Sequence, residues 1–117
     1  MKIVLQRVSR AQVSVDNQVV GSIGRGVCLL CGVGAQDTEE TARWCAAKCA
    51  ELRVFPDDEG KMNRSCLDIG GEALVVSQFT LLGACGKGRR PAFTAAAPPE
   101  KGERLYERFI EELRHRG

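Results

Sequence analysis

GVCLLCGVG, residues 26–34, is a continuous apolar run with glycine at both ends. A run of this kind is typical of a β-strand that is covered on both faces. Upstream of it, the pair Asp16-Asn17 separates two further strand-like segments and suits the left-handed turn of a β-hairpin. Val13 and Val15 alternate with polar residues, which is the period of a half-buried strand. The first third of the chain is therefore predicted to hold three strands.

Residues 37–53 are predicted to form a helix. Asp37 can cap it, and Glu40 three residues later completes a capping-box pattern. Its core-facing residues follow at helical spacing and are Ala42, Cys45, Cys49 and Leu52. After this helix, residues 52–55 (LRVF) are predicted to form a short strand and residues 56–60 a turn. An irregular polar connection then leads to the strand that carries LVVSQFTLL, residues 74–82.

A second helix is predicted to follow Pro98-Pro99, since proline is tolerated in the first turn of a helix. Leu105, Phe109 and Leu113 share one of its faces. The order βββ-α-ββ-α predicts a mixed fold, α/β or α+β, with a β-sheet or barrel-like core flanked by two helices. At 117 residues the chain is expected to form a single domain over residues 1–117.

The composition is that of an ordinary soluble protein, with 44% hydrophobic and 27% charged residues. No apolar stretch approaches the roughly 20 residues of a membrane span, and the N-terminal segment is too polar for a signal peptide. A cytoplasmic protein is therefore expected. Six cysteines lie among core-type residues, which favours reduced, mostly buried thiols over disulfides.

The formal charge of +2 predicts no partner by itself, but its distribution is uneven. No acidic residue occurs from Ala73 to Pro99, whereas Lys87, Arg89 and Arg90 fall together in GKGRRP. This segment is predicted to be an electropositive loop. It is read either as a solvated turn or as a phosphate-binding loop.

Three familiar chemistries fit the sequence poorly. Cys28, Cys31, Cys45 and Cys49 show zinc-like spacing, but residues three apart in a strand point to opposite faces. A thioredoxin-type redox pair would open a helix rather than lie inside an apolar run. The only histidine, His115, falls in the last turn of a charged helix, which makes a triad hydrolase improbable. No metal and no cofactor are expected.

The polar residues Ser77, Gln78 and Thr80 interrupt an otherwise apolar strand. Hydroxyls, an amide and the backbone N–H groups of a strand end can hold an ester and stabilise an oxyanion without a strong base. The alternative is that these side chains satisfy backbone groups locally at the end of a strand.

Four segments, taken together, resemble the D-aminoacyl-tRNA deacylase family: QRV at residues 6–8, GKMNRS at 60–65, VVSQFTL at 75–81 and KGRRPAFTAAAPP at 87–99. They occur in the order and with the spacing of that family. The resemblance implies hydrolysis of the ester that joins a D-amino acid, or glycine mischarged on tRNA-Ala, to the terminal adenosine of a tRNA. It also implies a homodimer that needs no metal, with its pocket near the subunit interface.

The resemblance assigns roles to individual residues. Ser77 and Gln78 would position the substrate, the Phe79 backbone N–H would meet the ester carbonyl, and Thr80 would be a nucleophile or, preferably, shape the pocket. Met62 and Asn63 match a segment near the substrate. Lys87, Arg89 and Arg90 would bind acceptor-stem phosphates, which confers affinity rather than sequence readout.

The chain departs from the family pattern in one respect. The family carries a Gly-Pro pair in a strand after the second helix, and this sequence contains no Gly-Pro. Arg7 matches the arginine that steadies the Gly-Pro loop, so here it would lack its target. The C-terminal strands of the family are therefore expected to be missing, and a truncated inactive form and a non-catalytic tRNA-binding relative remain as alternatives.

Overall fold

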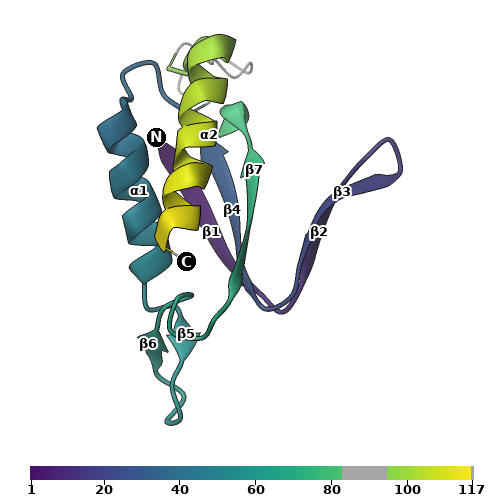
Figure 1. The fold of residues 1–117 in the computed structure, drawn as a ribbon, viewed down its shortest axis with the longest axis vertical. Helices are drawn as coiled ribbons and strands as arrows, with labels where there is room; N and C mark the ends of the chain where they lie inside the picture. The colour runs from purple at the N-terminus through teal and green to yellow at the C-terminus, as the bar shows by residue number, and fades with distance from the viewer. Residues whose placement is uncertain (83–94, 117) are drawn as a thin grey trace, which may run out of the picture.

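A three-stranded sheet carries two helices on one face in the computed structural model, which describes residues 1–82 and 95–116 (Figure 1). The strand order is β1-β4-β7. β1 (Lys2–Val8) pairs antiparallel with β4 (Gly26–Gly32), and β4 pairs parallel with β7 (Glu72–Ser77). The helices α1 (Glu39–Glu51) and α2 (Pro99–Arg116) pack against each other above this sheet.

The apolar run 26–34 forms the middle strand, as its composition suggests. Val27, Leu29 and Cys31 are buried beneath the helices. Cys28 and Leu30 on the other face are only half-buried. The prediction of a strand covered on both faces is therefore right for one face and only partly right for the other within the described residues.

The core lies between the sheet and the two helices. Leu105 and Phe109 of α2 are fully buried, and Leu113 packs against the same cluster. From α1 the buried contributors include Ala42, Cys45 and Cys49, all predicted from the helical spacing. Leu52 was expected to join them, but it lies one residue beyond the helix and remains 37% exposed.

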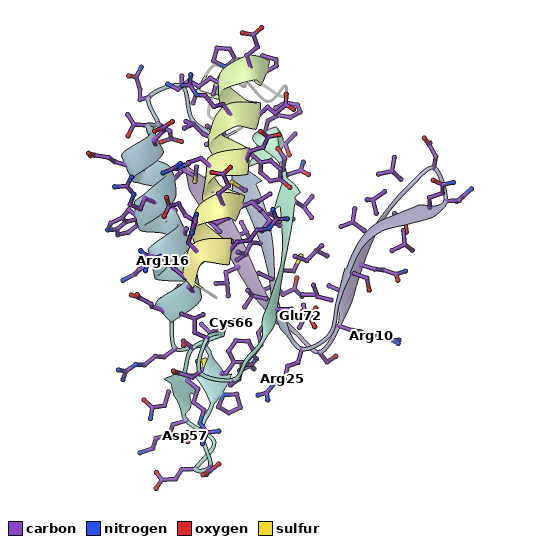
Figure 2. All side chains as sticks on the ribbon, in the orientation of Figure 1. Arg10, Arg25, Asp57, Cys66, Glu72 and Arg116 are labelled. Carbon is purple, nitrogen blue, oxygen red and sulfur yellow. The ribbon has the colours of Figure 1, made fainter. Side chains whose placement is uncertain are left out.

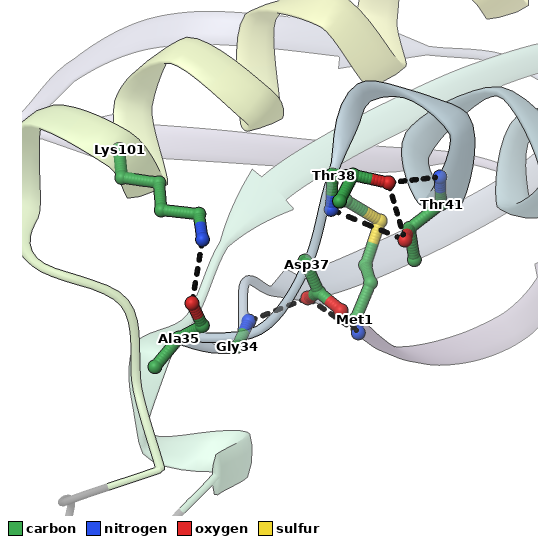
Figure 3. Close-up of polar contacts among 7 residues, drawn as sticks. All are labelled: Met1, Gly34, Ala35, Asp37, Thr38, Thr41 and Lys101. Carbon is green, nitrogen blue, oxygen red and sulfur yellow. Dashed lines mark hydrogen bonds and ion pairs between the residues drawn. The ribbon is translucent and has the colours of Figure 1, made fainter.

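Helix α1 begins two residues later than predicted, and its cap is different. The N-cap is Thr38, whose hydroxyl accepts from the Thr41 N–H at 3.4 Å while the Thr38 N–H donates to the Thr41 hydroxyl at 3.2 Å (Figure 3). Asp37 cannot serve as the cap because it is engaged elsewhere. Its carboxylate is paired with the N-terminal ammonium of Met1 and accepts from the Gly34 N–H at 2.6 Å.

The predicted N-terminal hairpin is present, but it is a separate unit. β2 (Ala11–Val15) and β3 (Gln18–Ile23) are joined by Asp16 and Asn17, both with positive φ (50° and 66°), which confirms the predicted turn. The chain breaks between β1 and β2, so the first third holds four strands rather than three. Figure 1 shows this hairpin leaving the body of the molecule.

The end of the sheet where β1 finishes is closed by close backbone packing. Figure 2 shows Arg25, Cys66 and Glu72 together here, where the Glu72 N–H donates to the Arg25 carbonyl at 3.0 Å. The Cys66 thiol donates to the Glu72 carbonyl at 3.6 Å. A Cβ at Gly26 would overlap the Glu72 backbone, so this approach requires glycine.

Below this end lies a two-stranded sheet that was not predicted. β5 (Phe55–Pro56) pairs with β6 (Met62–Arg64), in a region expected to be a short strand followed by an irregular connection. Asp57 orders the intervening turn by accepting from the N–H groups of Glu59 and Lys61 at 2.9 and 3.0 Å. These hydrogen bonds, that from Lys61 foremost, hold the pKa of the Asp57 carboxyl below its ordinary value.

The mixed α+β class with two helices is confirmed, although the strand count is higher than the predicted order. Within residues 1–82 and 95–116, no helix is long and apolar enough to cross a membrane.

Candidate active site

Strand β7 ends inside the polar segment of LVVSQFTLL. Ser77 is its last residue, and residues Phe79–Leu82 form the 3₁₀ turn η1. The Gln78 N–H donates to the Cys31 carbonyl at 2.8 Å, which ties the strand end to β4. Gly32 lies directly beneath, where a Cβ would come within 3.0 Å of the Gln78 carbonyl oxygen. The turn can therefore sit close against the sheet.

A pocket of about 790 Å³ opens beside this strand end. β7 and its turn contribute Ser77 and Phe79, and β4 continues into Val33 at the pocket. The remaining lining comes from the start of α2 and the segment before it: Ala96, Ala97, Pro98, Pro99, Gly102, Glu103 and Tyr106. The lining is thus mostly apolar, with Ser77 as the polar residue on the strand side and Glu103 and Tyr106 as the polar residues opposite.

Backbone hydrogen bonds fix the wall before α2. The Ala35 N–H donates to the Ala95 carbonyl and the Ala97 N–H to the Val33 carbonyl, both at 2.9 Å. The Lys101 ammonium donates to the Ala35 carbonyl at 2.5 Å (Figure 3). These contacts attach the beginning of α2 to the end of β4.

Tyr106 joins α2 to β7. Its hydroxyl donates to the Val75 carbonyl at 2.8 Å, and burial raises the pKa of this phenol above its ordinary value. The phenol therefore stays protonated and acts as a fixed hydrogen-bond donor at the pocket wall.

The four residues of the predicted catalytic segment lie in different positions relative to the pocket. Ser77 and Phe79 line it, and both side chains are exposed. Gln78 and Thr80 are not among its lining residues; the Gln78 amide donates to the Thr80 hydroxyl. The hydrogen-bond partner of Thr80 is thus the side-chain amide of Gln78. An amide is not a base, so it cannot take up the hydroxyl proton of Thr80.

Other predicted residues lie at the far end of the molecule. Arg7 stands opposite Val27 near the start of β4, whereas Ser77 stands opposite Cys31 near its end. Four residues of strand separate the two positions, about 13 Å. The Arg7 guanidinium donates to the Val54 carbonyl at 2.8 Å.

Met62 and Asn63 lie on β6, beyond that same far end (Figure 1). The Met62 side chain is 67% exposed, and the Asn63 side-chain oxygen accepts from Arg53 at 3.3 Å. Within one chain they do not reach the pocket. Lys87, Arg89 and Arg90 lie outside the described residues.

The cysteines at positions 28, 31, 45, 49 and 66, which the structure describes, do not form a rival site. All five described cysteines are free, and burial raises the pKa of the Cys31 thiol to about 12 and that of Cys49 to about 11. A redox or nucleophilic cysteine needs a lowered pKa, so both shifts are in the wrong direction. No group of three or more metal-binding side chains occurs in residues 1–82 and 95–116.

A second pocket, of about 500 Å³, lies between the later turns of α2 and the sheet. Its lining is mostly aliphatic, with Cys49 and Cys66 among it and Glu72 and Arg114 as its charged residues. It offers no hydroxyl or amide side chain, so the pocket at the end of β7 is the better candidate for ester chemistry.

Gly102, Glu103 and Tyr106 were missed as site residues by the sequence reasoning. The sequence did contain a signal for them. Pro99, Gly102, Glu103 and Tyr106 are spaced three and four residues from Pro99 and from one another, which places them on one face of α2. That face could not be matched to the strand end without the tertiary structure.

Comparison with known proteins identifies the family of the chain. Residues 4–117 match the protein family described as D-Tyr-tRNA(Tyr) deacylase. The D-aminoacyl-tRNA deacylase of Thermotoga petrophila is 57% identical over 117 residues, which is all of this chain and 78% of the relative. That of Roseiflexus castenholzii is 58% identical over all of this chain and 74% of the relative.

Two solved structures share the fold. A protein described as c-Myc DNA Unwinding Element Binding Protein superposes with a TM-score of 0.92 at 43% identity, over 99% of this chain and 78% of that one. A probable eukaryotic D-amino acid tRNA deacylase superposes with a TM-score of 0.82 at 25% identity, over 97% and 66%. These likenesses define a mixed α+β deacylase fold. The chain belongs to the D-aminoacyl-tRNA deacylase family.

Proposed function

We propose that the protein hydrolyses the ester bond of D-aminoacyl-tRNA and releases a free D-amino acid and tRNA. The observation that carries the proposal is the pocket at the end of β7, lined by Ser77 and Phe79 in a chain of this family. Its volume of about 790 Å³ lies within the range of roughly 300–1,000 Å³ that is usual for small-molecule sites. The aminoacyl-adenosine end of a charged tRNA is a ligand of that class.

The chemistry requires positioning more than a strong base. An aminoacyl ester is already activated, and the neighbouring ribose hydroxyl can assist attack by water. The Phe79 backbone N–H would stabilise the oxyanion while Ser77, which lines the pocket, positions the substrate. Gln78 does not line the pocket and would act through its hydrogen bond to Thr80. Because Thr80 accepts from an amide, we assign it a role in shaping the pocket rather than that of nucleophile.

The direct test uses the 117-residue chain and tRNA charged with radiolabelled D-tyrosine or L-tyrosine. We expect release of D-tyrosine, with the L-ester spared. Intact D-ester after incubation with well-folded protein that still binds tRNA would instead make it a non-catalytic tRNA-binding relative. Equal hydrolysis of the D-ester and the L-ester would show that residues 1–117 do not carry the chiral selection. A third substrate, glycine on tRNA-Ala, tests the wider specificity.

The tRNA itself would be held by Lys87, Arg89 and Arg90 through acceptor-stem phosphates, in the cytoplasm where charged tRNA is used. Replacing Arg89 and Arg90 by alanine should weaken tRNA binding and lower the slope of log affinity against log salt by about 2. An unchanged slope would contradict this role.

We further propose that the active form is a homodimer with the pocket near the subunit interface. The support is the separation of Arg7, Met62 and Asn63 from the pocket in one chain (Figure 1). A second copy would bring these residues to the site.

Mixing two variants, each first shown to be inactive alone, tests the dimer: Gly102→Phe, which fills the pocket, and a variant with alanine at both Met62 and Asn63. If the site is shared, random exchange gives heterodimers that hold one intact site and restores about a quarter of the wild-type rate. No recovery after confirmed subunit exchange would contradict a shared site.

A further inference from the structure

A third pocket, of about 410 Å³, lies at the base of the hairpin formed by β2 and β3. Its lining residues are Arg10, Ala11, Gln12, Ser22 and Ile23. Figure 2 shows Arg10 at this base, on the side of the molecule away from the helices. The pocket is therefore separate from the one at the end of β7.

The strand register brings the polar side chains of this pocket onto one face of the hairpin. Gln12 pairs with Ser22, next to the pair of Ala11 and Ile23. Because successive side chains of a strand point to opposite faces, the polar pair lies on the face opposite to the apolar pair. Gln12 and Ser22 are exposed and Ile23 is buried, which agrees with this arrangement. Arg10 is also exposed and precedes Gln12 by two residues, the spacing that returns a side chain to the same face of an extended chain.

These three polar side chains can all donate hydrogen bonds. Arg10 offers guanidinium N–H groups, Gln12 an amide NH₂ and Ser22 a hydroxyl. None of the three side chains has a hydrogen-bond or ion-pair partner among residues 1–82 and 95–116. By contrast, the guanidinium of Arg25, which follows β3, lies over the Phe55 ring at 5.4 Å from its centroid. The donors of Arg10 are thus left for a ligand by the described part of the chain.

The charges of the hairpin favour an anionic ligand. Arg10 is the only charged residue among the described residues that line the pocket. The acidic residue of the hairpin, Asp16, lies in the turn at its tip, four residues from Gln12 and about 13 Å along the strand. Glu72 on β7 lines the pocket of about 500 Å³ instead. A guanidinium beside an amide and a hydroxyl donor suits an anion with several acceptor oxygens, such as a phosphate group.

We propose that the base of the hairpin binds a backbone phosphate of the tRNA through Arg10, Gln12 and Ser22. The inference rests on the proposed function for the identity of its ligand. It adds a phosphate contact that lies in a different part of the molecule from the pocket at the end of β7.

The length of β4 sets the distance between the two sites. The pocket at the end of β7 lies beside Cys31, and the hairpin joins the sheet at Gly26, five residues or about 16 Å away. A stacked nucleic-acid strand advances by about 3.4 Å per nucleotide, so this distance corresponds to about five nucleotides. A tRNA whose charged end lies in the pocket at β7 can therefore place a phosphate of its acceptor end at the hairpin.

Binding of uncharged tRNA tests the inference apart from turnover. Arg10→Gln should weaken binding by about tenfold at low salt, the lower end of the effect of a hydrogen bond to a charged group. It should also lower the slope of log affinity against log salt by about 1. Arg10→Lys keeps the charge, so it should keep the slope while recovering only part of the affinity. Ser22→Ala should weaken binding without changing the slope.

The matched control is Arg43→Gln, which removes the same charge from an exposed position on α1 that lines none of the three pockets. It should keep the wild-type affinity and slope, and urea denaturation confirms that each variant is folded. An unchanged slope in Arg10→Gln overturns the proposal. Equal losses of slope in Arg10→Gln and Arg43→Gln also overturn it, because they would report net charge alone.

Inorganic phosphate, titrated alone, separates a free anion from the tRNA backbone. The probe signal is the side-chain amide of Gln12 in the NMR spectrum, which should shift on phosphate binding in the wild type and not in Arg10→Gln. If phosphate shifts this signal but the tRNA slope does not depend on Arg10, the site takes a free anion and the tRNA contact is wrong. If the slope depends on Arg10 while D-tyrosyl-tRNA stays intact, the proposed function fails and the phosphate site stands.

Discussion

The two ends of the three-stranded sheet are built differently. At the end where β1 finishes, backbone packs on backbone: Gly26 lies against Glu72, and a Cβ at Gly71 would come within 2.9 Å of the Cys66 sulfur. At the end where β7 finishes, the chain turns away and leaves a pocket of about 790 Å³. A Cβ at Gly102 there would meet nothing within 4 Å.

The closed end therefore supports the fold, and the open end is the proposed site. The closed end fixes the register of the sheet, and the open end holds the hydroxyl, the aromatic ring and the carboxylate that a ligand can reach. The residues suggested by the family resemblance are divided between the two ends, with Ser77 at one and Arg7 and Met62 at the other. Residues that belong to the same set of family motifs therefore need not lie in the same site of one chain.

The largest expected effect comes from adding the same methyl group at both ends. Gly26→Ala should destabilise the fold by more than about 3 kcal/mol, because the new Cβ would overlap backbone that cannot move aside. Gly102→Ala should stabilise α2 by up to about 1 kcal/mol, since alanine favours a helix interior. Urea denaturation of both variants measures the contrast, and similar losses would remove the distinction between closed and open ends.

A bulky residue at the open end should abolish function without unfolding the protein. Gly102→Phe directs a ring into the pocket and should lower kcat/KM for D-tyrosyl-tRNA by at least about 100-fold, the scale of a misplaced substrate. The midpoint of urea denaturation serves as the control for folding. Full activity with the ring in place would show that the substrate binds elsewhere.

The buried thiols of Cys31 and Cys49 should be inaccessible to reagents and should lower the stability of the fold only at alkaline pH. Cys31 stands beside Ser77 in the sheet, and burial raises its pKa to about 12 and that of Cys49 to about 11. Above pH 9 the unfolded chain releases thiol protons that the folded chain retains, so stability falls as pH rises from 9 toward these values. Each thiol should contribute roughly 1 kcal/mol per pH unit over its own window.

Urea denaturation between pH 8 and 11 measures that slope, and replacing Cys31 by alanine should reduce it. At pH 8, a thiol reagent should modify the half-buried Cys28 before Cys31 or Cys49. Rapid modification of Cys31 in folded protein would show that the pocket opens into the core.

The smallest effect on stability is expected at Met62. Its side chain is 67% exposed, so Met62→Ala should change the unfolding free energy by no more than about 0.5 kcal/mol. A loss of deacylation in this stable variant would favour a contribution to the pocket of a second copy. Unchanged activity would leave Met62 as an ordinary exposed residue.

Local patterns predicted the elements whose determinants are local. Asp16 and Asn17 carry the turn chemistry themselves, and Leu105 and Phe109 reveal their helix by spacing alone. The cap of α1 was wrong because Asp37 is claimed by the amino group of Met1, thirty-six residues away. No pattern around residue 37 could show that contact.

The site was predictable in part for the same reason. Ser77 stands out because it interrupts an apolar strand, and Phe79 was added by the family resemblance; both line the pocket. Glu103 resembles any exposed helical glutamate until the hydrogen bond from Tyr106 to Val75 fixes which face of α2 meets the strand end. Sequence periodicity cannot identify residues whose role depends on how one element packs against another.

The ion pair between Met1 and Asp37 links the fold to the processing of the chain (Figure 3). A formyl or acetyl group, or an affinity tag fused ahead of Met1, would remove the ammonium charge and leave a carboxylate that is nearly buried without its counterion. The contact thus depends on the positive charge of the Met1 amino group, which only a free ammonium carries.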